Sequence, residues 1–198
     1  MSKADVHIIG AAQDGRRQRS ARSREAIIKA SLALIDQGVL VPTAQQIAEQ
    51  AGVGVRSFFR HFEDMEALFE AVDTHAREQL YAPFERQPVS GTLAERVDGF
   101  LKNQLNAYGQ LQNIILSAQT QAWRSKVLRH NYARDQRRLR DVLLRWFPEL
   151  QDKPMAKCEA ADAATSFDMW YRLRHHQQLG ARESQAIMRD FLLSVLTD

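Results

Sequence analysis

The chain of 198 residues is long enough for one large domain or two small ones, and its 44% hydrophobic and 26% charged residues are typical of a soluble globular protein. Its formal net charge of +3 and pI near 9.2 are mildly basic and compatible with a polyanionic partner. The single cysteine, Cys158, excludes an intrachain disulfide framework, and no apolar run approaches the roughly 20 residues that cross a bilayer, so we expect a cytoplasmic protein with no membrane segment.

The N-terminal region is polar and rich in arginine. We expect residues 1–20 to form a flexible basic arm outside the folded domain. From residue 22 to residue 37, apolar side chains recur at helical spacing, and Gly38 follows as a C-terminal cap. The sequence therefore predicts a first helix over 22–37.

The next segment has the pattern of a helix-turn-helix. Thr43 and Gln46 have the spacing of a capping box, which predicts a second helix over 44–51. A third short helix is expected over 55–61. Between them, Gly52 permits the positive φ that a tight turn requires. Two short helices joined in this way form a helix-turn-helix.

The third helix has two unlike faces. Phe58 and Phe62 are four residues apart and are expected to pack inwards against Ile47. The opposite face carries Val55, Arg56, Ser57, Phe59 and Arg60, with His61 at its edge. Arginine can donate two hydrogen bonds to guanine in a major groove, and arginine and histidine can reach phosphates. Phe59 has two interpretations, core packing or an apolar contact to a thymine methyl group or sugar.

Helical periodicity continues to the end of the chain. A fourth helix begins at acidic residues near position 64 and ends at about Tyr81, and the composition of the proline-containing segment over 83–91 is typical of a linker. Further helices are expected over about 92–107, 109–122, 125–146, 156–178 and 182–196. The expected fold is all-α, with a three-helix domain over 21–82 that contains the helix-turn-helix and a larger helical domain over 83–198.

The span from about Arg22 to Leu80 resembles the DNA-binding domain of TetR-family transcriptional repressors. The residues that carry the resemblance are Gly38, Thr43, Ile47, Ala48, Ala51, Gly52, Val53, Phe59, Arg60, His61, Phe62, Glu66, Ala67, Leu68 and Phe69. The stretch MWYRLRHHQQLGARESQAIMRDFLLSVL also resembles the last helix pair of the family. The resemblance implies a homodimer that binds a palindromic operator in double-stranded DNA and is released by a small-molecule effector, here unknown.

Three positions depart from the family pattern. Family members usually carry Ser, Tyr and Lys where this chain has Gly54, Phe59 and Met65, and those three side chains typically touch phosphate. We hypothesise that the arginine-rich arm supplies some of the missing charge through Arg16, Arg17, Arg19, Arg22 and Arg24. The expected DNA-contacting residues are Arg22, Arg24, Thr43, Gly54, Val55, Arg56, Ser57, Phe59, Arg60 and His61.

The C-terminal helices carry many aromatic residues, most of which are expected in the core. The resemblance implies an effector pocket, with weak candidates at Phe100, Leu116, Trp123, Tyr132, Phe167, Trp170 and Tyr171. The last helix has one apolar face with Ile187, Phe191 and Val195 and another with Met188, Leu192 and Leu196. A helix apolar over so wide an arc buries two surfaces, so we expect one face in the core and one in a dimer interface formed by the last two helices.

Two other classes of function compete with this interpretation. The sequence shows no paired carboxylates, nucleophile–base set, phosphate loop or metal-ligand spacing, so neither an enzyme nor a cofactor or metal site is expected. The alternative that stays open is a ligand-independent DNA-binding protein, or a co-regulator whose C-terminal domain binds a protein partner.

Overall fold

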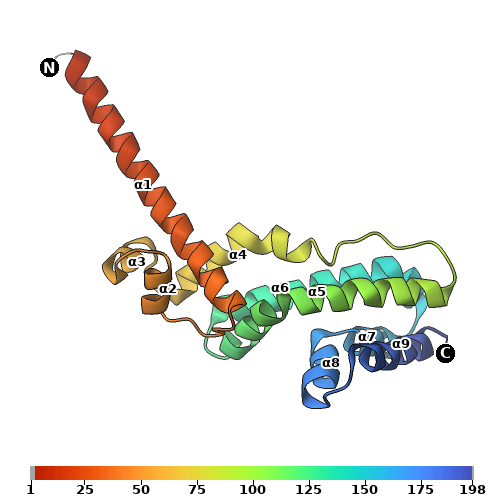
Figure 1. Ribbon diagram of the computed structural model, residues 1–198. Coiled ribbons are helices and arrows are strands. Elements are labelled where there is room, and N and C mark those ends of the chain that lie inside the picture. Colours follow the sequence, from red (N-terminus) through yellow and green to blue (C-terminus); the bar gives the residue numbers. More distant parts are fainter. Residues whose placement is uncertain (1–2, 198) are drawn as a thin grey trace. The chain divides into compact units, whose positions relative to one another are not determined.

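The computed structural model describes residues 3–197, and side chains from residue 17 onwards. Every regular element in this range is helical, which confirms the all-α fold (Figure 1). The chain divides into two compact units. The first comprises Met1–Arg77 and Asn113–Asn131, and the second comprises Glu78–Gln112 and Tyr132–Asp198.

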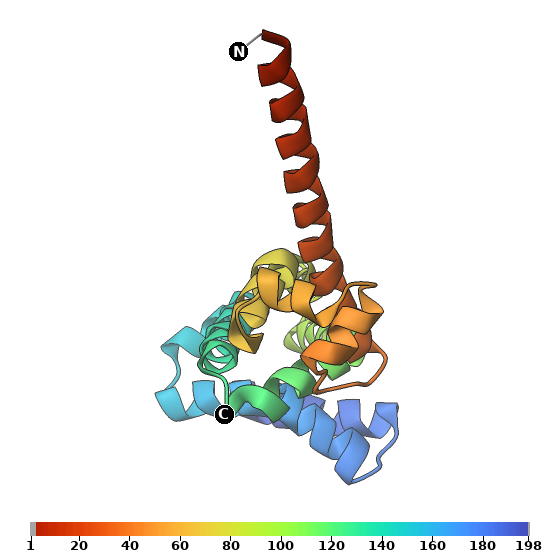
Figure 2. The ribbon, with the colours of Figure 1, turned by 90° about the vertical axis from the view of Figure 1, so that its left-hand side faces the viewer.

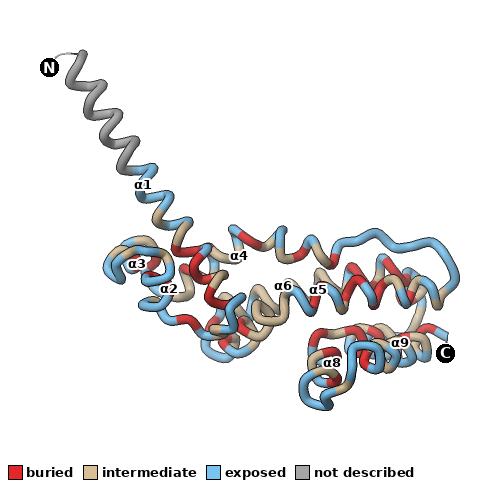
Figure 3. The backbone as a smooth tube through the Cα atoms, in the orientation of Figure 1, coloured by how far each residue is buried: buried red, intermediate tan, exposed pale blue. Residues whose placement is uncertain are grey.

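The first unit is built on α1 (Lys3–Asp36), α2 (Ala44–Gln50), α3 (Val55–His61) and most of α4 (Met65–Tyr81). Its core includes Ile27, Ile28, Leu34, Ile47, Ala48, Phe58, Phe62, Leu68 and Ala71. Figure 3 shows that the buried positions of α1 lie in its C-terminal part, and among the described side chains of α1 they begin at Ile27. The apolar periodicity of the sequence therefore identified the buried face of α1, and the spacing of Phe58 and Phe62 that of α3.

The arm expected over residues 1–20 is not separate from the first helix. Helix α1 begins at Lys3 and continues without a break to Asp36, a length of 34 residues (Figure 2). A polar stretch of chain is not necessarily irregular, and the flexibility of the arm stays a prediction. The stretch contains no proline, and alanine, arginine and glutamine are good helix formers. The side chains of 3–16 lie outside those described.

The two turns of the helix-turn-helix follow the expected chemistry. Gly38 ends the first helix with φ of 94°, and Gly52 lies between α2 and α3 with φ of 67°. The Thr43 hydroxyl accepts a hydrogen bond from Gln46 N at 3.2 Å, and Gln46 Oε1 accepts from Thr43 N at 2.9 Å. The capping box is therefore complete, and α2 and α3 form where the sequence predicts them.

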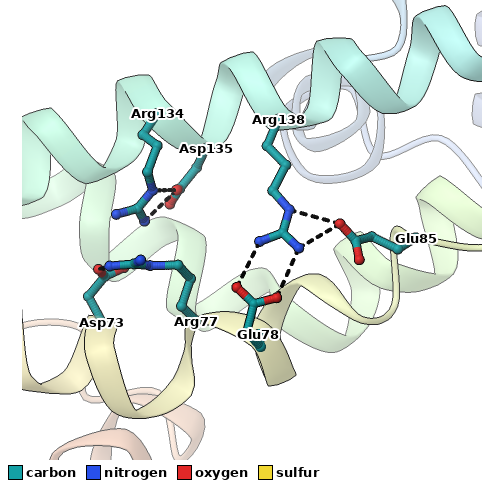
Figure 4. A network of polar contacts seen from close by, with 7 residues as sticks. All are labelled: Asp73, Arg77, Glu78, Glu85, Arg134, Asp135 and Arg138. Atoms are coloured by element: carbon teal, nitrogen blue, oxygen red, sulfur yellow. Dashed lines mark hydrogen bonds and ion pairs between the residues drawn. The ribbon is translucent and has the colours of Figure 1, made fainter.

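The second unit draws on the later helices of the chain. These are α5 (Leu93–Ala122), α6 (Lys126–Trp146), the 3₁₀ turn η1 (Pro148–Asp152), α7 (Met155–Ala164), α8 (Phe167–Tyr171), the π turn η2 (Arg172–His176) and α9 (Ala181–Thr197). Its core includes Phe100, Leu101, Tyr108, Leu143, Phe147, Leu150, Met188 and Leu192. In this unit Arg138 donates hydrogen bonds to Glu78 and Glu85, which fastens α6 to the end of α4 and the segment after it (Figure 4).

Two expectations for the helices in this part of the chain are wrong. Segments 92–107 and 109–122 form the single 30-residue helix α5, because Gly109 is tolerated inside a helix at a cost of about 1 kcal/mol. Conversely, 156–178 is not continuous. Helix α7 ends at Ala164, and Ser166 caps a new helix by accepting from Met169 N at 3.1 Å. A serine hydroxyl competes well for backbone N–H groups, which favours such a restart.

The division into units differs from the expected boundary between 82 and 83. The boundary in α4 falls between Arg77 and Glu78, and residues 113–131 belong with the helix-turn-helix. The first part of helix α5 belongs to the second unit and its last part to the first unit. A single boundary in the linker over 83–91 therefore does not separate the two units.

Candidate nucleic-acid interface

Helix α3 separates an apolar face from an exposed one. Phe58 and Phe62 are 0% and 2% exposed and belong to the core with Ile47. On the other side, Val55 is 40% exposed and Phe59 is 53% exposed. The buried aromatic pair holds the helix against α2, and the exposed side is available to a partner.

Two arginines give the exposed face of α3 its charge. Arg56 is exposed and no side chain within 17–197 pairs with it. Arg60 is also exposed and donates to Ser57 Oγ at 2.8 Å, which restricts its guanidinium to the side of Ser57. The unpaired guanidinium of Arg56 keeps all its donors for an external acceptor such as the major-groove edge of guanine.

Phe59 is not a core residue. Its ring meets Phe58 edge-on, with centroids 5.2 Å apart at 77°, but about half of the side chain is exposed. Phe59 is therefore a surface residue supported from beneath by a core aromatic. An apolar contact between this ring and DNA stays a prediction.

His61 is less accessible than the sequence suggested. Its side chain is half-buried, and among the described residues its Nε2 atom is buried without a hydrogen-bond partner. Burial lowers the pKa of His61, and the positive charges of Arg60 and Arg24 lower it further. The residue ends α3, where the chain turns back, so only part of the ring can face an outside partner.

His61 also lines a groove of about 650 Å³ in the first unit. The groove is lined by Arg24 and Ile28 of α1, by His61 and Phe62, and by Ala67, Glu70, Ala71, Thr74 and His75 of α4. Its polar rim has both signs of charge, and its floor is apolar. The open side of His61 therefore faces this groove, whereas its Nε2 atom is buried.

The remaining expected contacts lie at the ends of the short helices and on α1. Thr43 is exposed, and its hydroxyl is engaged in the capping box. Gly54 is the N-cap of α3 and provides no side-chain cap. Arg22 and Arg24 are exposed on α1, and the Arg24 guanidinium lies 4.9 Å from the centre of the Phe62 ring. The structure thus places Arg24 close to the end of α3.

Polar contacts that sequence reasoning missed fasten 113–131 to the helix-turn-helix. Ser117 Oγ and Gln121 Nε2 donate to the carbonyl oxygen of Leu40, at 2.7 and 3.2 Å. Glu66 Oε2 accepts from the backbone N–H of Val127 at 3.0 Å. These partners are separated by 61 to 81 positions in the chain, so no local pattern signals them.

The sequence of the helix-turn-helix and of the helices around it matches a known protein family. Residues 27–72 match the family model for bacterial regulatory proteins of the tetR family. The chain carries a TetR-family DNA-binding domain. It is accordingly a DNA-binding transcriptional regulator, as the resemblance implied. No curated protein matches the chain.

The seven effector-pocket candidates of this regulator are divided between the two units. Phe100, Phe167 and Trp170 are buried in the second unit, and Tyr132 and Tyr171 are half-buried there. Leu116 and Trp123 belong to the first unit instead. Trp123 follows the last residue of α5 and is 78% exposed. A role for Trp123 in an effector pocket stays a prediction.

The buried candidates pack against one another as core residues do. Phe100 meets Trp146 and Phe147 edge-on, at centroid distances of 5.7 and 5.4 Å. Phe167 lies 5.5 Å from both Tyr108 and Trp170. Within the described part of the regulator, no group of three or more His, Cys, Asp or Glu residues is arranged to hold a metal ion. The same part contains no helix long and apolar enough to cross a membrane.

Proposed function

We propose that this regulator is a ligand-responsive repressor that binds a palindromic operator as a homodimer, with α3 of each subunit in a major groove. The observation that carries the proposal is the two-faced helix α3. Phe58 and Phe62 fix it from within, and Arg56 is presented with unpaired donors. A two-fold dimer then requires two half-sites related by the same symmetry and spaced by about one helical turn or more.

Helix α9 supports dimerisation through the last two helices. Met188, Leu192 and Leu196 are at most 6% exposed and form the face towards the core. On another face, Phe191 is 50% exposed beside a shallow hollow of about 330 Å³ that is also lined by Ile187, Asp190 and Ser194. A large aromatic side chain beside a hollow suits a self-complementary contact, in which each ring enters the hollow of the other copy.

Buried polar groups in the second unit support an effector site. Gln104 Nε2 donates to the Tyr108 hydroxyl at 2.9 Å, and that hydroxyl donates to Thr165 O at 2.9 Å. Gln104 Oε1 and Ser184 Oγ are buried without a partner among the described residues. A buried unsatisfied acceptor costs about 1–3 kcal/mol, which an effector carrying a hydrogen-bond donor would recover. A coupling of that size is enough for a usable switch between DNA-bound and released states.

A second candidate is ligand-independent DNA binding, with a C-terminal part that only dimerises or binds a protein partner. The close aromatic packing around Phe167 favours it. The rings of Tyr108, Phe167 and Trp170 already contact one another, at centroid distances of 5.5 to 5.8 Å. An effector would have to separate these rings before it could lie between them.

In-vitro selection of duplex DNA at fixed salt tests the proposal. Three full-length proteins are compared: the wild type, Arg56→Ala, and Arg86→Ala as a control on an exposed arginine of the second unit outside α9. We expect the wild type and the control to enrich the same palindrome, and Arg56→Ala to lose or relax one position in each half-site. Enrichment of no sequence by the wild type contradicts operator reading. An enriched palindrome also provides the probe with which releasing compounds are screened.

A further inference from the structure

The turn between α5 and α6 has an unusual surface. Trp123 is 78% exposed, and Arg124 and Lys126 are exposed beside it in the sequence. No acidic residue occurs in the sequence between Asp98 and Asp135. Tryptophan is rarely so exposed without a partner, and tryptophan and arginine are enriched at the centres of binding surfaces. We refer to Trp123, Arg124 and Lys126 as the Trp123 surface.

Hydrogen bonds place one end of the Trp123 surface beside the start of the helix-turn-helix. Arg124 donates to Gln121 Oε1 at 2.9 Å, and Gln121 Nε2 donates to Leu40 O at 3.2 Å. Leu40 is three residues before Thr43, the N-cap of α2. When a helix-turn-helix binds DNA, its first helix crosses the phosphate backbone. Arg124 is therefore linked through Gln121 to the loop that leads into α2.

The other end of the Trp123 surface is fixed to the helix that follows α3. Lys126 precedes Val127, whose backbone N–H donates to Glu66 Oε2 at 3.0 Å. Glu66 is the second residue of α4 and comes five positions after the end of α3. The turn is thus held at both flanks of the helix-turn-helix, and all of these residues belong to the first unit.

We propose that the Trp123 surface is a further DNA-binding element that contacts the phosphate backbone flanking the half-site read by α3. Arg124 and Lys126 pair with phosphates, and the Trp123 ring packs against an adjacent sugar. The inference rests on the proposed reading of DNA by α3, and it adds a contact from a part of the chain outside residues 27–72. Phosphate contacts raise affinity without selecting sequence, so this surface strengthens binding and leaves the operator unchanged.

The salt dependence of operator binding tests the charged part of the surface. The double variant Arg124→Gln/Lys126→Gln is compared with the control Arg137→Gln/Arg145→Gln, which removes two exposed arginines of α6 in the second unit. Removal of one phosphate-bound cation reduces the steepness of log K against log salt by about 0.9. For Arg124→Gln/Lys126→Gln we therefore expect the steepness to fall by about 1.8. The control slope should equal that of the wild type. Equal slopes for both double variants would overturn the proposal.

Tryptophan fluorescence tests the surface by a separate route. Trp146 and Trp170 are 2% and 7% exposed, so quenching by acrylamide reports chiefly on Trp123. Saturation with operator DNA should reduce this quenching, and Trp123→Phe should abolish the difference. Unchanged quenching in the bound complex overturns the proposal. So does protection that grows with protein concentration in the absence of DNA, because the surface would then join two copies of the chain.

The two proposals fail in different ways. If α3 does not read DNA, the wild type selects no operator and Arg56→Ala changes nothing. If only the Trp123 surface is assigned wrongly, the wild type still selects an operator and Arg56→Ala still relaxes it. In that case Arg124→Gln/Lys126→Gln has the same salt slope as the wild type, and operator DNA does not change the quenching of Trp123.

Discussion

The guanidinium carbon of Arg24 lies 4.9 Å from the centre of the Phe62 ring. Phe62 directly follows α3 and is buried in the core of the first unit, whereas Arg24 lies on the exposed part of α1. A cation over an aromatic ring is worth about 0.5–1 kcal/mol at such a site. The contact therefore places a positive charge of the first helix at the end of α3.

The first prediction concerns the N-terminal part of α1. Arg17 is seven residues before Arg24, which is about two helical turns, so the two share a face. If this face follows the phosphate backbone, deletion of residues 1–19 should lower the salt dependence of operator binding by about 0.9 for each phosphate that the deleted residues bind. Thermal unfolding should change little, because the buried positions described for α1 begin at Ile27. An unchanged slope would sink the hypothesis that the arm supplies charge.

The second prediction concerns pH. Burial, with Arg60 and Arg24, lowers the pKa of His61 below its ordinary value of about 6.5. The unfolded chain then binds the proton more readily than the folded one, so stability is lost as pH falls below about 6.5. In urea unfolding between pH 5 and 8, His61→Gln should weaken this dependence. His75→Gln, on an exposed histidine that lines the same groove, should retain it. Identical pH profiles for the wild type and His61→Gln would contradict the assignment.

The helix-turn-helix could be predicted from sequence because its signals are local. The capping box joins residues three positions apart, and the turn depends on a single glycine, Gly52. Phe58 and Phe62 are likewise one helical turn apart. Each signal involves residues only a few positions apart, so it can be recognised from the sequence alone.

The third prediction separates two glycines that are two positions apart. Gly52 has φ of 67°, a region that costs other residues about 1–2 kcal/mol, so Gly52→Ala should lower the free energy of unfolding by about that amount. Gly54 is the N-cap of α3 with φ of −71° and no side-chain cap. Gly54→Ser should therefore raise stability by a few tenths of a kcal/mol. An added Cβ meets nothing within 4 Å at either site, so the contrast comes from the backbone conformation at Gly52 and the added hydroxyl cap at Gly54. Equal effects in urea unfolding would refute this account.

The fourth prediction concerns Arg138, which joins elements of the second unit (Figure 4). It donates to both oxygens of Glu78 at 3.1 and 3.2 Å and to Glu85 at 2.6 Å, and its guanidinium lies 4.3 Å from the Tyr81 ring centre. Its carboxylate partners are partly exposed, so each ion pair contributes much less to the free energy of unfolding than a buried ion pair would. We expect Arg138→Met to lower the free energy of unfolding by about 1–2 kcal/mol, less at high salt.

The matched control is Arg137→Met, which removes the neighbouring exposed arginine and should change stability by less than about 0.5 kcal/mol. Arg138→Lys should fall between the two, because a lysine keeps the charge but cannot form the same fork of hydrogen bonds. If Arg137→Met and Arg138→Met unfold alike in urea, the contacts of Arg138 add nothing to stability.

The features that could not be predicted depend on distant contacts. The Leu40 carbonyl is bound by side chains 77 and 81 residues away, which is why residues 113–131 join the first unit. Nor does local spacing reveal that Trp123 is exposed, since an aromatic residue at a helix end suits a core equally well. Composition identified the helices, but the position of a helix end relative to its neighbours decided which residues reached the surface.

The fifth prediction concerns the homodimer. Phe191 is 50% exposed on α9, whereas Leu192 beside it is fully buried, so a change at Phe191 leaves the core of the second unit intact. We expect Phe191→Asp to convert the proposed dimer to a monomer in sedimentation velocity, because a second carboxylate would then be buried beside Asp190 in the contact between the copies. Operator affinity should fall sharply as well, since a monomer holds only one half-site.

Met155→Asp is the matched control, because Met155 is 77% exposed on α7 and the substitution introduces the same charge in the same unit. It should leave both the dimer and operator binding unchanged. If Met155→Asp dissociates the dimer and Phe191→Asp does not, the interface includes the start of α7. If both variants stay dimeric, α9 does not join the subunits through Phe191, and the spacing of the half-sites is set by another surface.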